Sequence, residues 1–282
     1  MLFARVLALA SLTAAAVAVD QATYDSLVHY FKYAASTYAT ACAYPNGQTL
    51  VSTFSDKKTD TQGFISRDDV RQEFVIAFRG STNLKDAKQF NETELVDYPG
   101  VSGDHPPRVH KGFINAYNSV KPTIVNTITS ALVGQHAHYA LVAVGHDSGG
   151  ALAVLTGPTL RNTFIDNRSQ VYTYGQPRTG DLQFAFFIDE LMGFSVHRAV
   201  NKKDGIPKII PLDVENGYVH HPAEYWTGAD PPSAATTVGC REFGEAVVGE
   251  DELCSLSVNT HLPNADHYVY YGIPVTQSFC TP

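Results

Sequence analysis

One six-residue segment constrains the fold more than any other part of the chain. Positions 145–150 read Gly-His-Asp-Ser-Gly-Gly. A buried strand that turns sharply into a helix needs small residues two positions before and two positions after the residue at its tip, because strand and helix approach each other there. Gly145 and Gly149 meet this requirement around Asp147. If Ser148 stood at the tip, a histidine would occupy one of the crowded positions, so the spacing predicts Asp147 at the tip.

The flanking residues support a strand, a turn and a helix in this order. His138 to Val144 is a short apolar run of β-branched and aromatic residues, which is typical of a buried parallel strand. Ala151 to Leu155 offers the small and apolar residues of a helix packed on a sheet. A glycine-rich loop without chemistry would not need these flanks.

Further strands and helices alternate along the chain, which predicts a mostly parallel sheet with helices on both faces. Apolar spacing predicts a helix over Tyr24–Ala41, and a long helical stripe runs from Phe113 to Leu132, where Pro122 is expected to kink or divide the helix. The other predicted elements are strands at 61–67, 73–78, 171–174 and 196–200 and a helix at 182–191. Residues 201–265 are rich in Pro, Gly, Asp and Asn and are predicted to be loops.

The N-terminus has the pattern of a secretory signal peptide. One positive charge precedes the apolar stretch Val6–Val19, and Ala16-Val17-Ala18 supplies a cleavage pattern. We therefore expect residues 1–18 to be a signal peptide and residues 19–282 to be one secreted domain. No later segment is apolar and long enough to predict integral membrane association.

Four cysteines in a secreted chain are expected to form two disulfides, and three pairings are possible on paper. A Cys42–Cys280 bridge would join the chain ends, and Cys240–Cys254 would then close a surface loop. The wide and irregular spacing does not favour zinc. Two sequons predict glycosylation at Asn91 and Asn167.

Charge and histidine placement exclude other classes of function. A net charge of −8 with a pI of about 5.7 and no basic run argues against nucleic acid binding. The histidine pairs at 136/138 and 220/221 lack a partnering carboxylate or cysteine pattern, so we predict no metal site.

Three further motifs follow predicted strands, where function gathers in such sheets. Phe78-Arg79-Gly80-Ser81-Thr82 can offer a backbone N–H and a hydroxyl to an oxyanion. Asp204 and His267 come later, in the order nucleophile, acid, histidine that is typical of α/β-hydrolases.

At these motifs the chain resembles the fungal class 3 lipases, the α/β-hydrolase family that includes the type A feruloyl esterases. The resemblance covers nearly all of the predicted mature chain. The matching stretches are FRGST (78–82), VHKGFINAY (109–117), GHDSGGALA (145–153), YTYGQPRTGD (172–181), DGIPKIIP (204–211), GYVHHPAEYW (217–226) and ADHYVYYG (265–272).

The resemblance implies an α/β-hydrolase fold with a short lid and a role for each motif. Asp204 is expected to be the triad acid and His267 the triad base, and Ser81 with the Ser148 backbone N–H is expected to form the oxyanion hole. It also implies that Cys42 pairs with Cys280. The implied chemistry is hydrolysis of a small-molecule ester or lipid without cofactor or metal, and we expect a monomer.

Asp147 departs from the family pattern, which reads G-H-S-L-G. A triad serine attacks an ester carbonyl after histidine removes its proton. A carboxylate attacking the same carbonyl would give a mixed anhydride, which is uphill from an ester. Carboxylates are instead useful at saturated carbon, and GHDSGG is similar to the G-H-D-x-G elbow of epoxide hydrolases and haloalkane dehalogenases. Ser148 is expected to point away from His267, because one helical residue turns the side chain by roughly 100°.

The expected lid is polar. Asn83 to Val101 carries six charged side chains and no tryptophan, whereas an interfacial lipase lid presents a large apolar face to lipid. This composition favours a soluble ester, as in the feruloyl esterase branch.

Three hypotheses about activity follow from these observations. The first is an ester hydrolase that tolerates the altered elbow or uses Ser148, with reduced activity. The second is a non-catalytic descendant that binds a lipid, aryl ester or glycan. The third is a hydrolase in which Asp147 is the nucleophile toward epoxides or halides.

Overall fold

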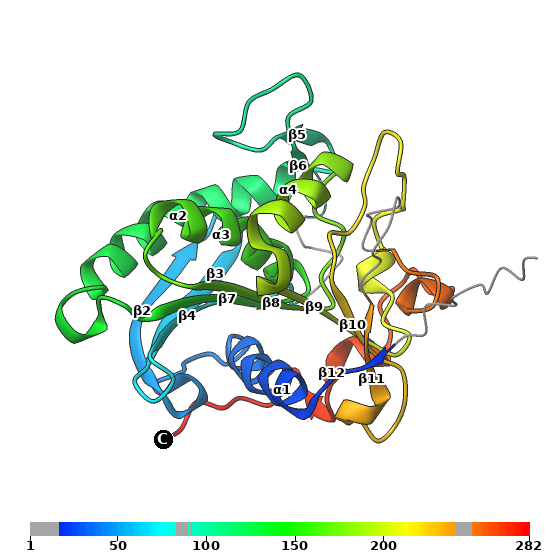
Figure 1. Ribbon diagram of the computed structural model, residues 1–282. Helices are drawn as coiled ribbons and strands as arrows, with labels where there is room; N and C mark the ends of the chain where they lie inside the picture. Colours follow the sequence, from blue (N-terminus) through cyan, green and yellow to red (C-terminus); the bar gives the residue numbers. More distant parts are fainter. Residues whose placement is uncertain (1–16, 83–89, 91, 241–249) are drawn as a thin grey trace, which may run out of the picture.

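A nine-stranded sheet organises the chain in the computed structural model, which describes residues 17–82, 90, 92–240 and 250–282 (Figure 1). The spatial order of the strands is β1-β11-β10-β9-β8-β7-β4-β3-β2. The strands are β1 (Val17–Ala18), β2 (Thr49–Asp56), β3 (Thr61–Asp68), β4 (Glu73–Phe78), β7 (Ala140–His146), β8 (Ser169–Tyr174), β9 (Val196–Asn201), β10 (Glu224–Thr227) and β11 (Thr237–Cys240).

The centre of the sheet is parallel and its edges are antiparallel. Strands β4, β7, β8, β9 and β10 pair in parallel, whereas β2, β3, β11 and β1 add antiparallel edges. Two small antiparallel pairs lie outside this sheet, β5 (Leu95–Asp97) with β6 (Arg108–His110) and β12 (Val269–Tyr270) with β13 (Ile273–Pro274). The predicted mostly parallel sheet is confirmed.

Helices cover both faces of the sheet. In Figure 1, α1 (Gln21–Ser36) lies on one face, and α2 (Lys111–Ala131), α3 (Ser148–Thr163) and α4 (Leu182–Met192) lie on the other. Alternate residues of β4 enter the two cores. Phe74, Ile76 and Phe78 pack with the three-helix side, and Val75 and Ala77 pack with α1. Because both faces are buried, the strand reads in the sequence as a continuous apolar run from Phe74 to Phe78.

Two helices differ from the sequence predictions at their ends or interior. Helix α1 begins three residues earlier than predicted, because Asp20 caps it by accepting the Thr23 N–H at 2.7 Å. Helix α2 runs through Pro122 as one element, so the predicted division is wrong. Pro122 lies on the exposed side of the helix, where water can satisfy the carbonyl that loses its partner.

The region predicted to be loops contains two strands of the main sheet. Strand β10 pairs in parallel with β9, and β11 continues the edge. Glu224 of β10 is buried and forms an ion pair with Arg198 of β9 at 2.9 Å. The prediction of loops is wrong here because these strands have only four residues each and a buried charged residue obscures the apolar pattern.

The structure describes only the last two residues of the predicted signal peptide. Residues 1–16 lie outside the described residues, and the last two residues of the predicted signal peptide form β1, which pairs with Gly239 and Val238. Cleavage after Ala18 would therefore remove this edge strand. Within the described ranges, no helix combines the length and apolarity needed to cross a membrane.

Both disulfides occur in the pairing that was expected. Cys42 bonds with Cys280, and Cys240 bonds with Cys254. The first bridge joins residues 238 positions apart and fixes the C-terminal segment beside the end of α1, where the Phe279 N–H donates to Ser36 Oγ at 3.0 Å.

Candidate active site

The turn between β7 and α3 has the strained geometry that the glycine spacing predicts. Asp147 stands at the tip with φ 57° and ψ −132°, a conformation that L residues rarely adopt. A methyl group on Gly145 would lie 2.0 Å from the Gly149 carbonyl oxygen. One on Gly149 would lie 2.4 Å from the Phe78 carbonyl oxygen. Neither backbone can move aside, so both positions require glycine and the tip is Asp147.

The two other predicted triad residues, Asp204 and His267, lie near Asp147 at the carboxyl ends of the parallel strands. Asp204 follows β9, and His267 lies in the short helix Ala265–Tyr268. His267 Nδ1 lies 2.9 Å from Asp204 Oδ2, and His267 Nε2 lies 3.8 Å from Asp147 Oδ1. All three side chains are buried, so the imidazole lies between two carboxylates inside the protein.

Asp204 is held in its charged form by several donors. Tyr270 Oη donates to Asp204 Oδ2 at 2.7 Å, and the Ile206 N–H donates to Oδ1 at 2.9 Å. Burial acts to raise the pKa of Asp204, but the charge of His267 and these hydrogen bonds together hold the pKa below its usual value. Sequence reasoning missed Tyr270, although it belongs to the matching stretch 265–272.

The two oxygens of Asp147 have different surroundings. Oδ2 accepts the Ser81 backbone N–H at 2.8 Å. Oδ1 is buried and has no hydrogen-bond partner within the described part of the chain. Burial raises the pKa of this carboxyl, against the charge of His267 and the backbone N–H groups of Ser148 and Ser81.

The imidazole of His267 favours its protonated form. Burial acts to lower the pKa of His267, but the Asp204 carboxylate and, to a smaller extent, the Asp147 carboxylate raise it overall. A negative charge on each side stabilises the imidazolium. The site therefore places the imidazole between two carboxyl groups that favour its protonated form.

Ser81 and Ser148, the two residues expected to form the oxyanion hole, lie side by side. Their hydroxyl oxygens are 3.1 Å apart, so Ser148 Oγ contacts the hydroxyl of Ser81 instead of the His267 ring. Ser148 is the first residue of α3, so its backbone N–H points toward the turn, as N–H groups at a helix start do. The expected orientation of Ser148 away from His267 agrees with this geometry.

A second, neutral histidine, His146, lies against the His267 ring, with the ring centroids 4.4 Å apart. His146 Nε2 donates to the His267 carbonyl oxygen at 2.9 Å, so His146 Nδ1 accepts the Tyr38 hydroxyl at 2.7 Å. Burial, aided by the charge of His267, lowers the pKa of His146 to about 3. His146 is therefore uncharged and fixes the backbone of His267.

Gly175 was missed as a site residue although it lies in a matching stretch. It follows β8 with φ +56°, and a methyl group there would lie 2.6 Å from Asp204 Oδ2 and 3.0 Å from His267 Nδ1. Glycine at this position leaves the space in which Asp204 and His267 meet.

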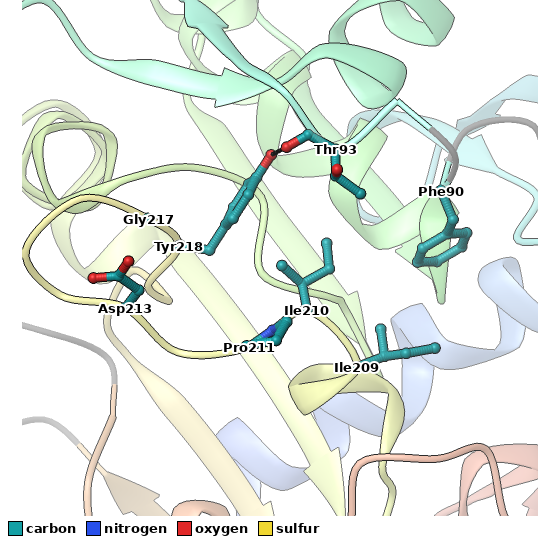
Figure 2. Close-up of a pocket in the computed structure, with 8 residues that line it drawn as sticks. All are labelled: Phe90, Thr93, Ile209, Ile210, Pro211, Asp213, Gly217 and Tyr218. Carbon is teal, nitrogen blue, oxygen red and sulfur yellow. Dashed lines mark hydrogen bonds between the residues drawn. The ribbon is translucent and has the colours of Figure 1, made fainter.

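An apolar cavity of about 490 Å³ adjoins the loop that carries Asp204 (Figure 2). Its wall includes Ile209 and Ile210, which directly follow the short helix Ile206–Lys208. Figure 2 shows the side chain of Phe90 beside these isoleucines and the hydrogen bond from Tyr218 Oη to the Thr93 carbonyl, 2.7 Å long. The lining does not include Asp147 or His267.

The other predicted features are placed as follows. Asn91 and residues 83–89 of the predicted lid lie outside the described residues. Asn167 is only 7% exposed, and its amide nitrogen donates to the Ala137 and Tyr139 carbonyls at 2.9 Å. This placement argues against the predicted glycan on Asn167, because both amide hydrogens are used inside the protein.

Two acidic residues of the predicted lid form polar contacts with helix α2. Glu92 accepts from Asn115 Nδ2 at 2.9 Å, and Glu94 forms an ion pair with Lys111 at 2.8 Å. The described end of this segment is thus attached to the start of α2 by polar contacts.

The geometry supports acid–base chemistry beside a carboxylate. His267 can give or take a proton at Nε2, Asp204 orients the ring, and the Ser81 N–H can stabilise an oxyanion. The group at the tip is a carboxylate, and one of its oxygens already uses the oxyanion donor.

Comparison with known proteins places this chain among the lipases. A model of the lipase (class 3) family matches residues 75–214. A lipase from Rhizomucor miehei is 30% identical over 228 residues, which cover 79% of this chain and 59% of the relative. A secreted mono- and diacylglycerol lipase from Fusarium solani is 29% identical and is matched over 67% of this chain and 54% of its own length. The chain thus spans little more than half the length of these relatives.

A solved structure matches over nearly its whole length. The crystal structure of a lipase from Rhizopus microsporus var. chinensis superposes with a TM-score of 0.79 at 30% identity, covering 92% of this chain and 91% of that chain.

Proposed function

Because the chain belongs to the class 3 lipase family, we propose that it is a secreted carboxylic ester hydrolase in which Asp147 reduces ester turnover strongly. Asp204 and His267 keep the roles of acid and base, and the Ser81 N–H, with that of Ser148, keeps the role of oxyanion donor. The substrate class is a lipid or aryl ester, bound without cofactor or metal by a monomer.

The hydrogen bond from the Ser81 N–H to Asp147 Oδ2 carries this proposal. An ester needs that donor for its carbonyl oxygen as charge develops there. A carboxylate accepts a stronger hydrogen bond than a neutral carbonyl, so Asp147 competes with the substrate for the donor. Asp147 also offers no hydroxyl that His267 could activate. Two requirements of ester hydrolysis are thus missing through one side chain.

Secretion is supported by independent features. The signal peptide pattern at residues 1–18 and two disulfides are typical of an oxidising compartment. The Fusarium solani relative is described as secreted.

The test is esterase turnover of wild type and Asp147→Ser on a short-chain p-nitrophenyl ester and a feruloyl ester. We expect Asp147→Ser to exceed wild type by at least a thousand-fold, because loss of a triad nucleophile costs on the order of 10⁶ in kcat and leaves only roughly 10³ over the uncatalysed rate. Asp147→Asn is the matched control, since it removes the charge without adding a nucleophile, and it should stay at the wild-type level.

A contrary outcome would identify a different nucleophile. High wild-type turnover that disappears in Ser148→Ala would show that Ser148 attacks the ester and that Asp147 does not suppress activity. In the restored enzyme, Asp147→Ser combined with His267→Ala should return to background.

A further inference from the structure

We propose that His29, Asp68 and Glu73 form a binding site for a divalent transition metal, with Zn²⁺ as the best fit, which joins helix α1 to the hairpin of β3 and β4. One ligand atom from each of the three side chains lies within 4.8 Å of the other two. The cluster lies at the start of β4, whereas Ser81 and Asp147 follow the ends of β4 and β7. The metal site is therefore separate from the candidate active site.

The hairpin places two buried carboxyl groups opposite each other. Asp68 at the end of β3 and Glu73 at the start of β4 are cross-strand partners and are only 2% and 4% exposed. The N–H groups of Val70 and Arg71 donate to Asp68 Oδ1 at 2.9 Å, so the turn fixes this carboxylate beside Glu73. Directly opposed like charges destabilise a sheet, and a buried charge needs a counter-charge or a metal. A divalent cation between the two groups would replace this repulsion with attraction.

Two ligand atoms of the cluster are buried without a partner. His29 Nε2 and Glu73 Oε1 lie 3.9 Å apart, and neither accepts or donates a hydrogen bond within the part of the chain that the structure describes. The other oxygen, Glu73 Oε2, accepts the Tyr30 hydroxyl at 2.8 Å, which fixes the orientation of the carboxyl group. Ligands bound at about 2.0–2.2 Å from a tetrahedral zinc ion stand roughly 3.4 Å apart. A closing movement of about half an ångström would therefore satisfy both atoms with one ion.

His29 is in the state that metal binding requires. Burial, aided by the charge of Arg71, lowers the pKa of His29 to about 4, so the imidazole is neutral near pH 7. Its Nδ1 lies 3.5 Å from the side-chain amide of Asn46. When the amide oxygen faces this nitrogen, Nδ1 keeps the ring proton and Nε2 presents its lone pair to the metal. The side chain of His29 is 20% exposed, so an ion can reach the cluster from solvent.

The donor set selects the metal. One imidazole nitrogen and two carboxylate oxygens suit Zn²⁺, and a water molecule would complete four ligands. Ca²⁺ and Mg²⁺ bind through oxygen, so the imidazole disfavours them. The expectation of no metal site came from histidine pairs close in sequence and overlooked His29, which folding brings to Asp68 and Glu73 from a distant position. Arg71 is exposed and lies over the Tyr30 ring, and the two carboxylates offset its charge.

Zinc binding by the untagged protein tests the site. The protein is treated with EDTA, zinc is titrated by calorimetry, and bound metal is counted by mass spectrometry. We expect one zinc ion per chain and a rise in melting temperature of roughly 5–10 °C when free zinc is about 100 times the dissociation constant, because the ion binds the folded state. His29→Gln and Glu73→Gln should each weaken binding by at least roughly a hundred-fold and abolish the rise.

His136→Gln is the matched control. His136 Nε2 lies 3.7 Å from Asp69 Oδ1, but no third ligand joins this pair within the described residues, so the variant should bind zinc as wild type does. Equal zinc affinity in wild type and His29→Gln would overturn the assignment, as would wild type that retains no zinc. Binding without a rise in melting temperature would overturn the joining of α1 to the hairpin.

A spectroscopic measurement on wild type decides the matter if His29→Gln and Glu73→Gln do not fold. Co²⁺ in place of zinc should give the intense visible absorption of a four-coordinate ion. The weak absorption of an octahedral ion would overturn the inference. None of these measurements depends on ester turnover, so their failure leaves the proposed function unaffected.

Discussion

Breaking the buried ion pair between Arg178 and Glu250 should destabilise the protein and loosen the cavity wall. The guanidinium donates to both carboxylate oxygens, at 2.6 and 2.8 Å, and the two side chains are 1% and 5% exposed. Arg178 Nη1 also donates to the carbonyl of Ile210, in the cavity wall, at 2.6 Å. Arg178→Met would keep much of the side-chain volume, but a buried carboxylate and a backbone carbonyl would lose the donors that Arg178 supplies.

The expected cost is large for one substitution. Removing one partner of a buried ion pair typically costs about 3–5 kcal/mol, because the remaining charge stays desolvated. At roughly 2–4 °C per kcal/mol for a chain of this size, the melting temperature should fall by roughly 6–20 °C. Urea unfolding followed by the fluorescence of Trp226, the one tryptophan of the chain, measures the change in free energy.

Two matched variants decide whether the reasoning is right. Arg67→Met removes the partly buried partner of the exposed Asp69 and should cost at most about 1 kcal/mol. Arg178→Met with Glu250→Gln should recover much of the loss, because Gln removes the charge and keeps an oxygen for the His220 N–H that Glu250 now accepts at 3.0 Å. A cost for Arg178→Met no larger than that for Arg67→Met would refute the argument.

Three further predictions concern the site and its frame. The pKa of His267, followed by NMR titration of the ring, should be lower in Asp147→Asn than in wild type, since a neighbouring negative charge is lost; equal values would mean that the two side chains do not interact. The pKa of His267 is raised on folding, so the stability that the imidazolium contributes is complete below the pKa of the unfolded chain and is lost as pH rises through the pKa of the folded protein. In Asp147→Asn the interval between these two pKa values should be narrower. Gly175→Ala should lower kcat of the Asp147→Ser enzyme far more than KM, and unchanged kinetics would show that the Asp204–His267 contact tolerates the methyl group. Serine substitution of the Cys42–Cys280 bridge should cost up to about 5 kcal/mol and that of Cys240–Cys254 up to about 3 kcal/mol in denaturant unfolding, and the reverse order would contradict the loop-entropy argument.

The elbow was predictable from sequence because its constraint is local. Strand, turn and helix lie within a few residues, and a methyl group on Gly145 or Gly149 would collide with backbone atoms of the same turn or of the adjacent strand β4. The central strands were predictable for a similar reason. Strand β4 has the predicted bounds Glu73–Phe78, because an uninterrupted apolar run buried on both faces is visible without knowing its neighbours.

Other features depended on contacts that no local pattern reports. The short strand β10 carries a buried charge, Glu224, which pairs with Arg198 on the neighbouring strand β9. The buried amide of Asn167 donates to carbonyls about 30 residues away, so a sequon that looks accessible in sequence is enclosed in the fold. Each outcome depends on a partner that folding brings from a distant part of the chain.

The sequence by itself determined that an aspartate stands at the elbow, and only the tertiary structure decided how its two oxygens are used. Ser81 lies 66 positions from Asp147 and His267 lies 120 positions away, yet one holds Oδ2 and the other faces Oδ1. Side-chain orientation in a buried site is set by which donors surround each atom. Ser81 and His267 reach Asp147 only when β4, β7 and the C-terminal segment come together at the carboxyl ends of the parallel strands.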